Sequence, residues 1–281
     1  GGVPDRSGRS KGRLTLPYAA PTDRMQRRLL SMRWRDALFA HWRVDPATVG
    51  ARLPEPLSVA THDGDAYLGV VPFEMTDIRP RGAPFGLSFP ELNLRTYVTD
   101  SDTKGVYFFN LDAADPLGVG VARALFRLPY YRASMDVTRD GDRVTFTSHR
   151  THRGAPEADF DATYGPAGET HAPEPGSREA FLVENYRFYT EGRDRVYYGD
   201  IAHEPWPLAD ADATIRENTL FEANGFEQPP GDPIVHYSPG TEVTADRIRR
   251  LDAESTPGTG AGADSAAGAS HGAVDISVDE A

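Results

Sequence analysis

The sequence contains no cysteine and only two lysines, Lys11 and Lys104, in 281 residues. The absence of cysteine excludes thiol nucleophiles, disulfides and cysteine-ligated metal centres. The other basic residues are arginines, so chemistry that needs a lysine amine has almost nothing to use. Because Lys104 follows the polar turn at 100–103, we expect it to be a solvated residue at a strand edge.

Long hydrophobic runs and concentrated positive charge are also missing. The longest apolar stretch, residues 67–73, is far shorter than the ~20 residues of a membrane-spanning helix. The first 13 residues contain no apolar signal region. The formal net charge is −12 and no basic stripe interrupts it. We therefore predict a cytoplasmic, acidic protein that binds neither membranes nor nucleic acid.

Several motifs that define enzyme classes are absent or incomplete. The sequence has no Walker A motif and no HExxH, and the segments at 86–90 and 118–123 lack glycines that a nucleophile elbow and a dinucleotide fingerprint need. No histidines or carboxylates show metal-ligand spacing, and we interpret His41 and His203 as hydrogen-bonded core residues. We expect no metal and no cofactor.

Composition divides the chain into three parts. Residues 1–13 are a basic arm and residues 251–281 an acidic tail, both predicted to be disordered. Residues 14–250 carry strand patterns about every dozen residues, with helices expected at 46–52, 117–126 and 178–189. Many strands with few helices predict one mainly β (α+β) domain, built as a curved, partly closed antiparallel barrel.

One strand pattern combines an apolar face with a chemically rich one. In residues 89–98, alternation places Glu91, Asn93, Arg95 and Tyr97 on one face and leucines on the other. Such a polar face is typical of a strand exposed to water. A carboxylate and a guanidinium two positions apart on one face also suit a small polar ligand, so both interpretations stay open.

Seven ordered motifs between about Met32 and Val243 resemble the YqjF-like family of uncharacterised prokaryotic proteins (domain of unknown function 2071). They are RWRDALFAHW, DGDAYLGVVPF, FPELNLRTYV, GVYFFNLDA, LPYY, GSREAFLVENYRFYT and HEPWPL. That family is similar to acetoacetate decarboxylase. The resemblance implies a barrel of the acetoacetate decarboxylase type around a buried cavity.

The resemblance also has a consequence for chemistry. The decarboxylase carries two consecutive lysines after a Tyr-Pro, and the first forms a Schiff base with the substrate. Here Tyr130 and Tyr131 stand in their place, after Leu128-Pro129. A phenol cannot form an imine, so the chain is not expected to be a Schiff-base decarboxylase. A glutamate on the preceding cavity strand of the decarboxylase corresponds to Glu91.

These observations favour a barrel that binds a small keto or carboxylic acid. The expected ligand-binding residues are Glu91, Asn93, Arg95, Tyr97, Tyr130, Tyr131 and Arg132. One alternative is a lyase, isomerase or hydrolase that uses acid–base chemistry at Glu91, Tyr130 and Tyr131. Another is a structural or oligomeric scaffold with a vestigial cavity. The sequence leaves the oligomeric state open, a homo-oligomer included.

Overall fold

The computed structural model describes residues 29–101, 103–114, 128–192 and 195–251. All of them belong to one unit, which ends at Leu251. The basic arm at 1–13, the expected helix at 117–126 and the tail from 252 onward lie outside the described residues. The predictions made for those segments therefore stay predictions.

The described residues are mostly strand. The elements are β1 (Leu30–Val44), α1 (Pro46–Gly50), β2 (Ser58–Val59), β3 (Ala66–Pro80), β4 (Leu87–Asp100), β5 (Thr103–Ala113), β6 (Tyr130–Asp140), β7 (Arg143–Arg150), β8 (Asp159–Pro166), α3 (Arg178–Val183), β9 (Arg187–Glu191), β10 (Val196–Ala202), β11 (Ala209–Asn218), α4 (Leu220–Ala223), β12 (Ile234–Ala245) and β13 (Arg249–Arg250). Within this part of the chain, no helix is both long and apolar enough to cross a membrane.

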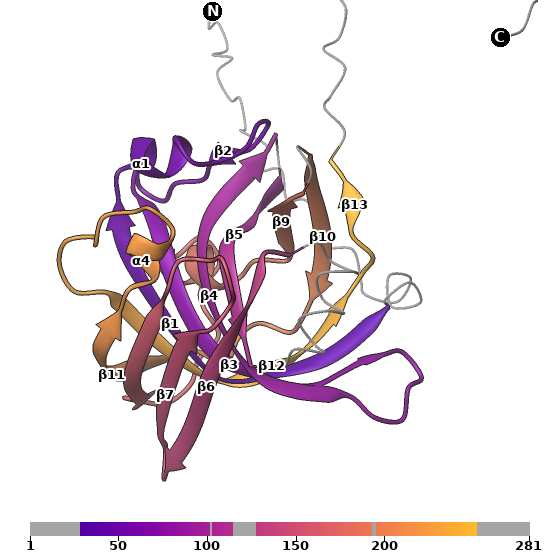
Figure 1. Cartoon of the computed structure of the whole chain (residues 1–281), viewed down its shortest axis with the longest axis vertical. Coiled ribbons are helices and arrows are strands. Elements are labelled where there is room, and N and C mark those ends of the chain that lie inside the picture. Colours follow the sequence, from indigo (N-terminus) through magenta and orange to yellow (C-terminus); the bar gives the residue numbers. More distant parts are fainter. Residues whose placement is uncertain (1–28, 102, 115–127, 193–194, 252–281) are drawn as a thin grey trace, which may run out of the picture. The chain divides into compact units, whose positions relative to one another are not determined.

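The strands form one 13-stranded sheet that closes on itself twice. Pairing of β4 with β5 closes a barrel of nine strands, in the order β5-β6-β7-β8-β11-β12-β1-β3-β4. Pairing of β10 with β12 closes a second ring, in which β9 and β10 join β5, β4, β3, β1 and β12. In Figure 1, β6, β7 and β11 lie on one side of the shared strands, and β9 and β10 lie on the other. The mainly β barrel expected from the sequence is confirmed.

The shared strands are buried on both faces because each face lines a different ring. On β4, Leu92 and Leu94 pack into the nine-stranded barrel with Phe146 and Phe160. Phe89 and Tyr97, on the opposite face, belong to a second hydrophobic cluster that includes Phe188 of β9. The polar face of β4 therefore points neither to water nor into the nine-stranded barrel, but into the second ring.

Two expectations about the strands and helices were wrong. The sheet is mixed rather than antiparallel, because β5 pairs in parallel with both β6 and β9. Parallel neighbours need a connection of a dozen or more residues, and β5 and β6 are separated by 16 residues in sequence. The helix expected at 178–189 ends at Val183, where the chain turns and enters β9. The aromatic residues at 186–189 fit the alternation of a strand as well as the stripe of a helix. Pairing with β5 and β10 makes this segment a strand.

Candidate functional site

The polar face of β4 borders a cavity of about 90 Å³ inside the second ring. Its walls come from β1, β3, β4, β5, β6, β9, β10 and β12, from the residues that follow α3, and from the segment after β10. Most wall residues are apolar. The side chains among them that carry nitrogen or oxygen atoms are Trp34, Glu91, Arg95, Tyr130, Asn185, His203 and Trp206.

Glu91 and Tyr130 meet at one end of this cavity. The Tyr130 hydroxyl donates to Glu91 Oε2 at 2.7 Å, and Asn93 Nδ2 lies 3.5 Å from Glu91 Oε1. Both partners of the short bond are buried. Burial raises the pKa of Glu91 to about 7, against the opposing effect of the Tyr130 and Asn93 hydrogen bonds. Glu91 can therefore hold or release a proton at neutral pH.

Replacing Glu91 with glutamine should change how stability depends on pH. The pKa of Glu91 in the folded protein, about 7, exceeds its ordinary value of 4.5. The folded state therefore binds more protons between these values, and wild-type stability falls as pH rises through this window. Glutamine does not ionise, so the variant does not carry the cost of a buried carboxylate anion at high pH. At pH 8 the variant should be more stable by about 3 kcal/mol, and the difference should shrink towards pH 4.5. Urea unfolding across this range measures the effect, and identical pH profiles would contradict it. Glu217→Gln, at an exposed glutamate, is the control.

Arg95 brings a buried positive charge to the cavity wall. Its side chain is 9% exposed, and its Nη2 donates to the Leu182 carbonyl at a long 3.4 Å. Within the described residues, no carboxylate lies within 4.0 Å of this guanidinium, and its Nε has no hydrogen-bond partner. Rings of Phe39 and Tyr97 lie 5.5 and 6.0 Å away. A buried cation without a counter-ion is costly, and an anionic ligand would relieve that cost.

Tyr97 connects β4 to β1 and to α3. Its hydroxyl donates to the Leu182 carbonyl at 2.7 Å, so it accepts from His41 Nε2 at 2.6 Å. Burial lowers the pKa of His41 well below its usual value, with further contributions from Arg95 and His236. A neutral His41 is therefore a structural hydrogen-bond donor, as the sequence suggested, and Tyr97 positions α3 over the cavity.

Three further polar residues line the cavity that the sequence did not single out as ligand-binding. Asn185 is 6% exposed, and its Nδ2 donates to the Leu182 carbonyl while its Oδ1 has no partner. Trp34 Nε1 and His203 Nε2 are likewise buried without a hydrogen-bond partner. Unsatisfied buried polar atoms are rare in proteins, so their concentration around one cavity is informative. All three lie within the motifs that carry the family resemblance, but those motifs assign them no ligand, and only the closure of β10 onto β12 brings them together.

Of the residues expected in the site, Asn93 and Tyr97 do not line the cavity although they share a strand face with Glu91, and Tyr131 and Arg132 lie away from it. Tyr131 follows Tyr130 on β6 and so points to the opposite face, where its ring stacks over the Arg150 guanidinium at 4.5 Å. Arg132 is exposed, and its backbone N–H donates to His152 Nδ1. The period of two in a strand explains the position of Tyr131. Arg132 shares the face of Tyr130 by the same alternation, but it is exposed and does not line the cavity.

The expectation for Lys104 was also wrong. Lys104 is partly buried rather than solvated, and its Nζ donates to the Phe181 carbonyl at 2.6 Å. The amine lies 4.3 Å from the centre of the Phe181 ring. Burial and the neighbouring Arg95 lower the pKa of Lys104 to about 7. The polar turn before it gave no sign of α3, which covers this strand edge only in the folded protein.

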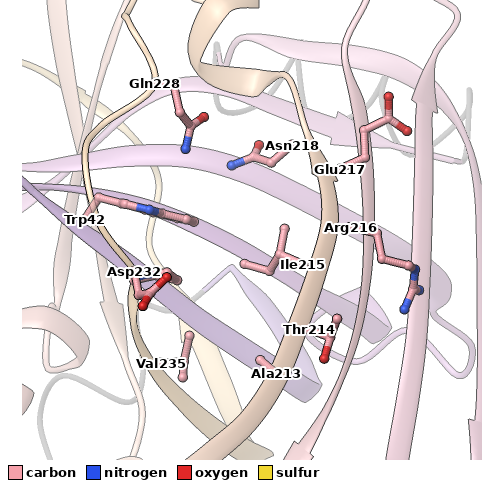
Figure 2. Close-up of a pocket in the computed structure, with 12 residues that line it drawn as sticks. Trp42, Ala213, Thr214, Ile215, Arg216, Glu217, Asn218, Gln228, Asp232 and Val235 are labelled. Atoms are coloured by element: carbon pink, nitrogen blue, oxygen red, sulfur yellow. The ribbon is translucent and has the colours of Figure 1, made fainter.

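A larger hollow of about 610 Å³ lies beside β11 (Figure 2). Its apolar floor includes Trp42, Ile215 and Val235, and its charged wall residues Arg216, Glu217 and Asp232 are all exposed. These exposed charges are hydrated by water, so they need no counter-ion from a ligand. Arg95 in the smaller cavity, by contrast, is buried. Nor does any group of three or more histidine, aspartate or glutamate side chains in the described residues suit a metal ion.

Solved structures with acetoacetate decarboxylase-like folds are similar to this chain. An acetoacetate decarboxylase superposes with a TM-score of 0.56 at 14% identity, over 79% of this chain and 89% of its own. The enduracididine biosynthesis enzyme MppR, complexed with pyruvate, gives 0.57 at 12% identity, over 88% and 99%. An acetoacetate decarboxylase-like enzyme from Sphingomonas wittichii RW1 gives 0.53 at 15% identity, over 87% and 100%. These likenesses establish an acetoacetate decarboxylase-like fold.

The family follows from the sequence comparison. Residues 31–242 match the model of a family of uncharacterised conserved proteins, domain of unknown function 2071. The uncharacterised protein YqjF of Bacillus subtilis (strain 168) is 41% identical over 218 residues, which cover 76% of this chain and 89% of that protein. The chain belongs to this family.

Proposed function

We propose that this protein binds a small keto or carboxylic acid in the cavity of the second ring. The observation that carries the proposal is Arg95, a buried guanidinium with no carboxylate within 4.0 Å among the described residues. A ligand carboxylate would pair with it through charge-assisted hydrogen bonds. Glu91 and Tyr130 would contact the ligand's carbonyl or hydroxyl oxygen at the other polar end.

The size of the cavity limits the ligand. Its volume of about 90 Å³ is roughly that of three water molecules in the liquid, which suits an acid of a few carbon atoms. Pyruvate is bound by MppR, a protein of the same fold. Binding here would be non-covalent at position 130, because the Tyr130 phenol cannot form an imine.

Titration with pyruvate, acetoacetate and acetate tests this proposal. We expect dissociation constants below about 1 mM for at least one keto acid, measured by calorimetry or by saturation-transfer NMR. Acetone, which has the carbonyl but no carboxylate, is the matched control and should bind at least tenfold more weakly, about 1.4 kcal/mol. Absence of binding at millimolar concentrations of every acid would instead support the scaffold with a vestigial cavity.

The pKa of Glu91 favours a second function, an enzyme that moves a proton on the same ligand. A carboxylate with a pKa of about 7 is suited to accept a proton from the carbon next to a keto group. The protein should then accelerate exchange of the pyruvate methyl protons in D₂O, and Glu91→Gln should abolish the acceleration. If pyruvate binds without any acceleration of exchange, the binding function stands and the catalytic one fails.

A further inference from the structure

Two cations approach the last turn of α3 without a carboxylate beside them. Lys104 Nζ donates to the Phe181 carbonyl at 2.6 Å, and Arg95 Nη2 contacts the adjacent Leu182 carbonyl at 3.4 Å. Within the described residues, neither cation has a carboxylate within 4.0 Å. The structure therefore holds two basic side chains close together where little water reaches them.

The surroundings of Lys104 favour its neutral amine. Its Nζ lies 4.3 Å from the centre of the Phe181 ring and 5.5 Å from that of Tyr97. Burial, then Arg95, lowers its pKa to about 7, and the more distant Glu184 opposes this. The Glu184 carboxylate already accepts hydrogen bonds from the Trp206 backbone N–H and the Tyr186 hydroxyl, so it does not pair with Lys104. A large fraction of Lys104 is therefore unprotonated and nucleophilic at neutral pH.

We propose that Lys104 is a site of reversible carbamylation by carbon dioxide, with Arg95 as the cation that stabilises the carbamate. The Nζ lone pair attacks the carbon of CO₂ and forms an N–C bond, while one C=O π pair moves to oxygen. The nitrogen then loses a proton to water, which leaves a carbamate anion on the lysine. No oxidant, reductant or second reactant is needed.

The sign of the product's charge decides between CO₂ and other small electrophiles. An iminium ion, formed with an aldehyde or ketone, would keep a positive charge beside Arg95. A carbamate replaces that repulsion with an attraction to the guanidinium, whose Nε has no hydrogen-bond partner. The proposal goes beyond acid binding in the cavity and does not need the cavity to be filled. Both ligands would use Arg95, so we expect them to compete.

Chemical trapping tests the proposal on the full-length wild-type chain. The protein is equilibrated with isotopically labelled bicarbonate and CO₂ at neutral pH, treated with triethyloxonium, digested and examined by mass spectrometry. The trapped ethyl carbamate should be at least about tenfold more abundant on Lys104 than on Lys11, because each unit of pKa changes the neutral fraction tenfold. Equal trapping on the two lysines, or none on Lys104, would overturn the proposal.

Variants test the role assigned to Arg95. Arg95→Gln should lower trapping on Lys104 at least about tenfold, since the anion loses its counter-ion and the pKa of Lys104 rises. Arg95→Lys keeps a cation and should retain trapping, which keeps the test decisive if the glutamine variant unfolds. Arg143→Gln, at an exposed arginine that pairs with Asp212, should change nothing. Undiminished trapping in Arg95→Gln, or a borohydride-reducible pyruvate adduct on Lys104 with no carbamate, would contradict the mechanism.

Discussion

Replacing Arg95 with leucine should weaken binding of pyruvate or acetoacetate at least about 30-fold. Removing one partner of a buried, hydrogen-bonded charge pair costs about 2–5 kcal/mol in other complexes, which corresponds to a factor of about 30 or more. Arg95 is the cavity-lining cation that the ligand carboxylate would contact. Calorimetric titration of the variant and of wild type measures the loss. Arg143→Leu, at an exposed arginine, should bind as wild type does.

The same substitution should not unfold the protein. Arg95 makes one long hydrogen bond, at 3.4 Å, and no ion pair within 4.0 Å in the described part of the chain. Leucine removes a buried charge that lacks a counter-ion, and burying such an unpaired charge is costly for the folded state. A melting temperature close to that of wild type, together with lost binding, identifies Arg95 as a ligand residue. A strongly destabilised variant would show that Arg95 has a structural role through α3.

Replacing Arg150 with methionine should lower the free energy of unfolding by about 3–5 kcal/mol. Arg150 donates to both carboxylate oxygens of Asp112, at 2.9 and 3.0 Å, and the two side chains are 1% and 0% exposed. This pair joins β5 to β7 directly beside Leu111, a wall residue of the cavity. Methionine leaves the Asp112 carboxylate buried without its partner. Chemical denaturation measures the loss.

Dependence on pH and a double substitution check this explanation. Burial already raises the pKa of Asp112 to about 6, and the Arg150 hydrogen bonds oppose that rise. Without Arg150 the folded pKa should rise further, so destabilisation should be largest at alkaline pH and smaller in acid. Asp112→Leu combined with Arg150→Met should recover part of the loss. Arg143→Met, which breaks the exposed pair with Asp212, should cost less than about 1 kcal/mol. A similar cost for both arginines would refute the interpretation.

Local sequence patterns predicted the parts of the fold that depend on neighbouring residues. The turn at Asp140-Gly141 joins β6 and β7 into a hairpin, with left-handed backbone at Gly141. The hairpin that the sequence indicates around Asp63-Gly64 does not form, because β2 pairs with β4 and only an isolated bridge joins His62 to Asp65. Alternation placed Glu91 and Arg95 on one face of β4, and the structure brings Tyr130 against Glu91. By contrast, β9 and β11 were missed. The alternating Ala and charged residues of β11 have little β-propensity, and pairing with β8 stabilises that strand.

The sequence by itself determined a cysteine-free, acidic, mainly β protein, since these properties depend only on composition and local order. Only the tertiary structure decided that the sheet closes twice, because that depends on β10 meeting β12, strands some thirty residues apart in sequence. The second closure is what buries Arg95 without a counter-ion and adds Asn185 and His203 to the wall of the cavity. The tertiary structure also determines the burial of Lys104. A lysine after a polar turn is ordinarily hydrated, but here α3 packs over Lys104 and excludes water from it.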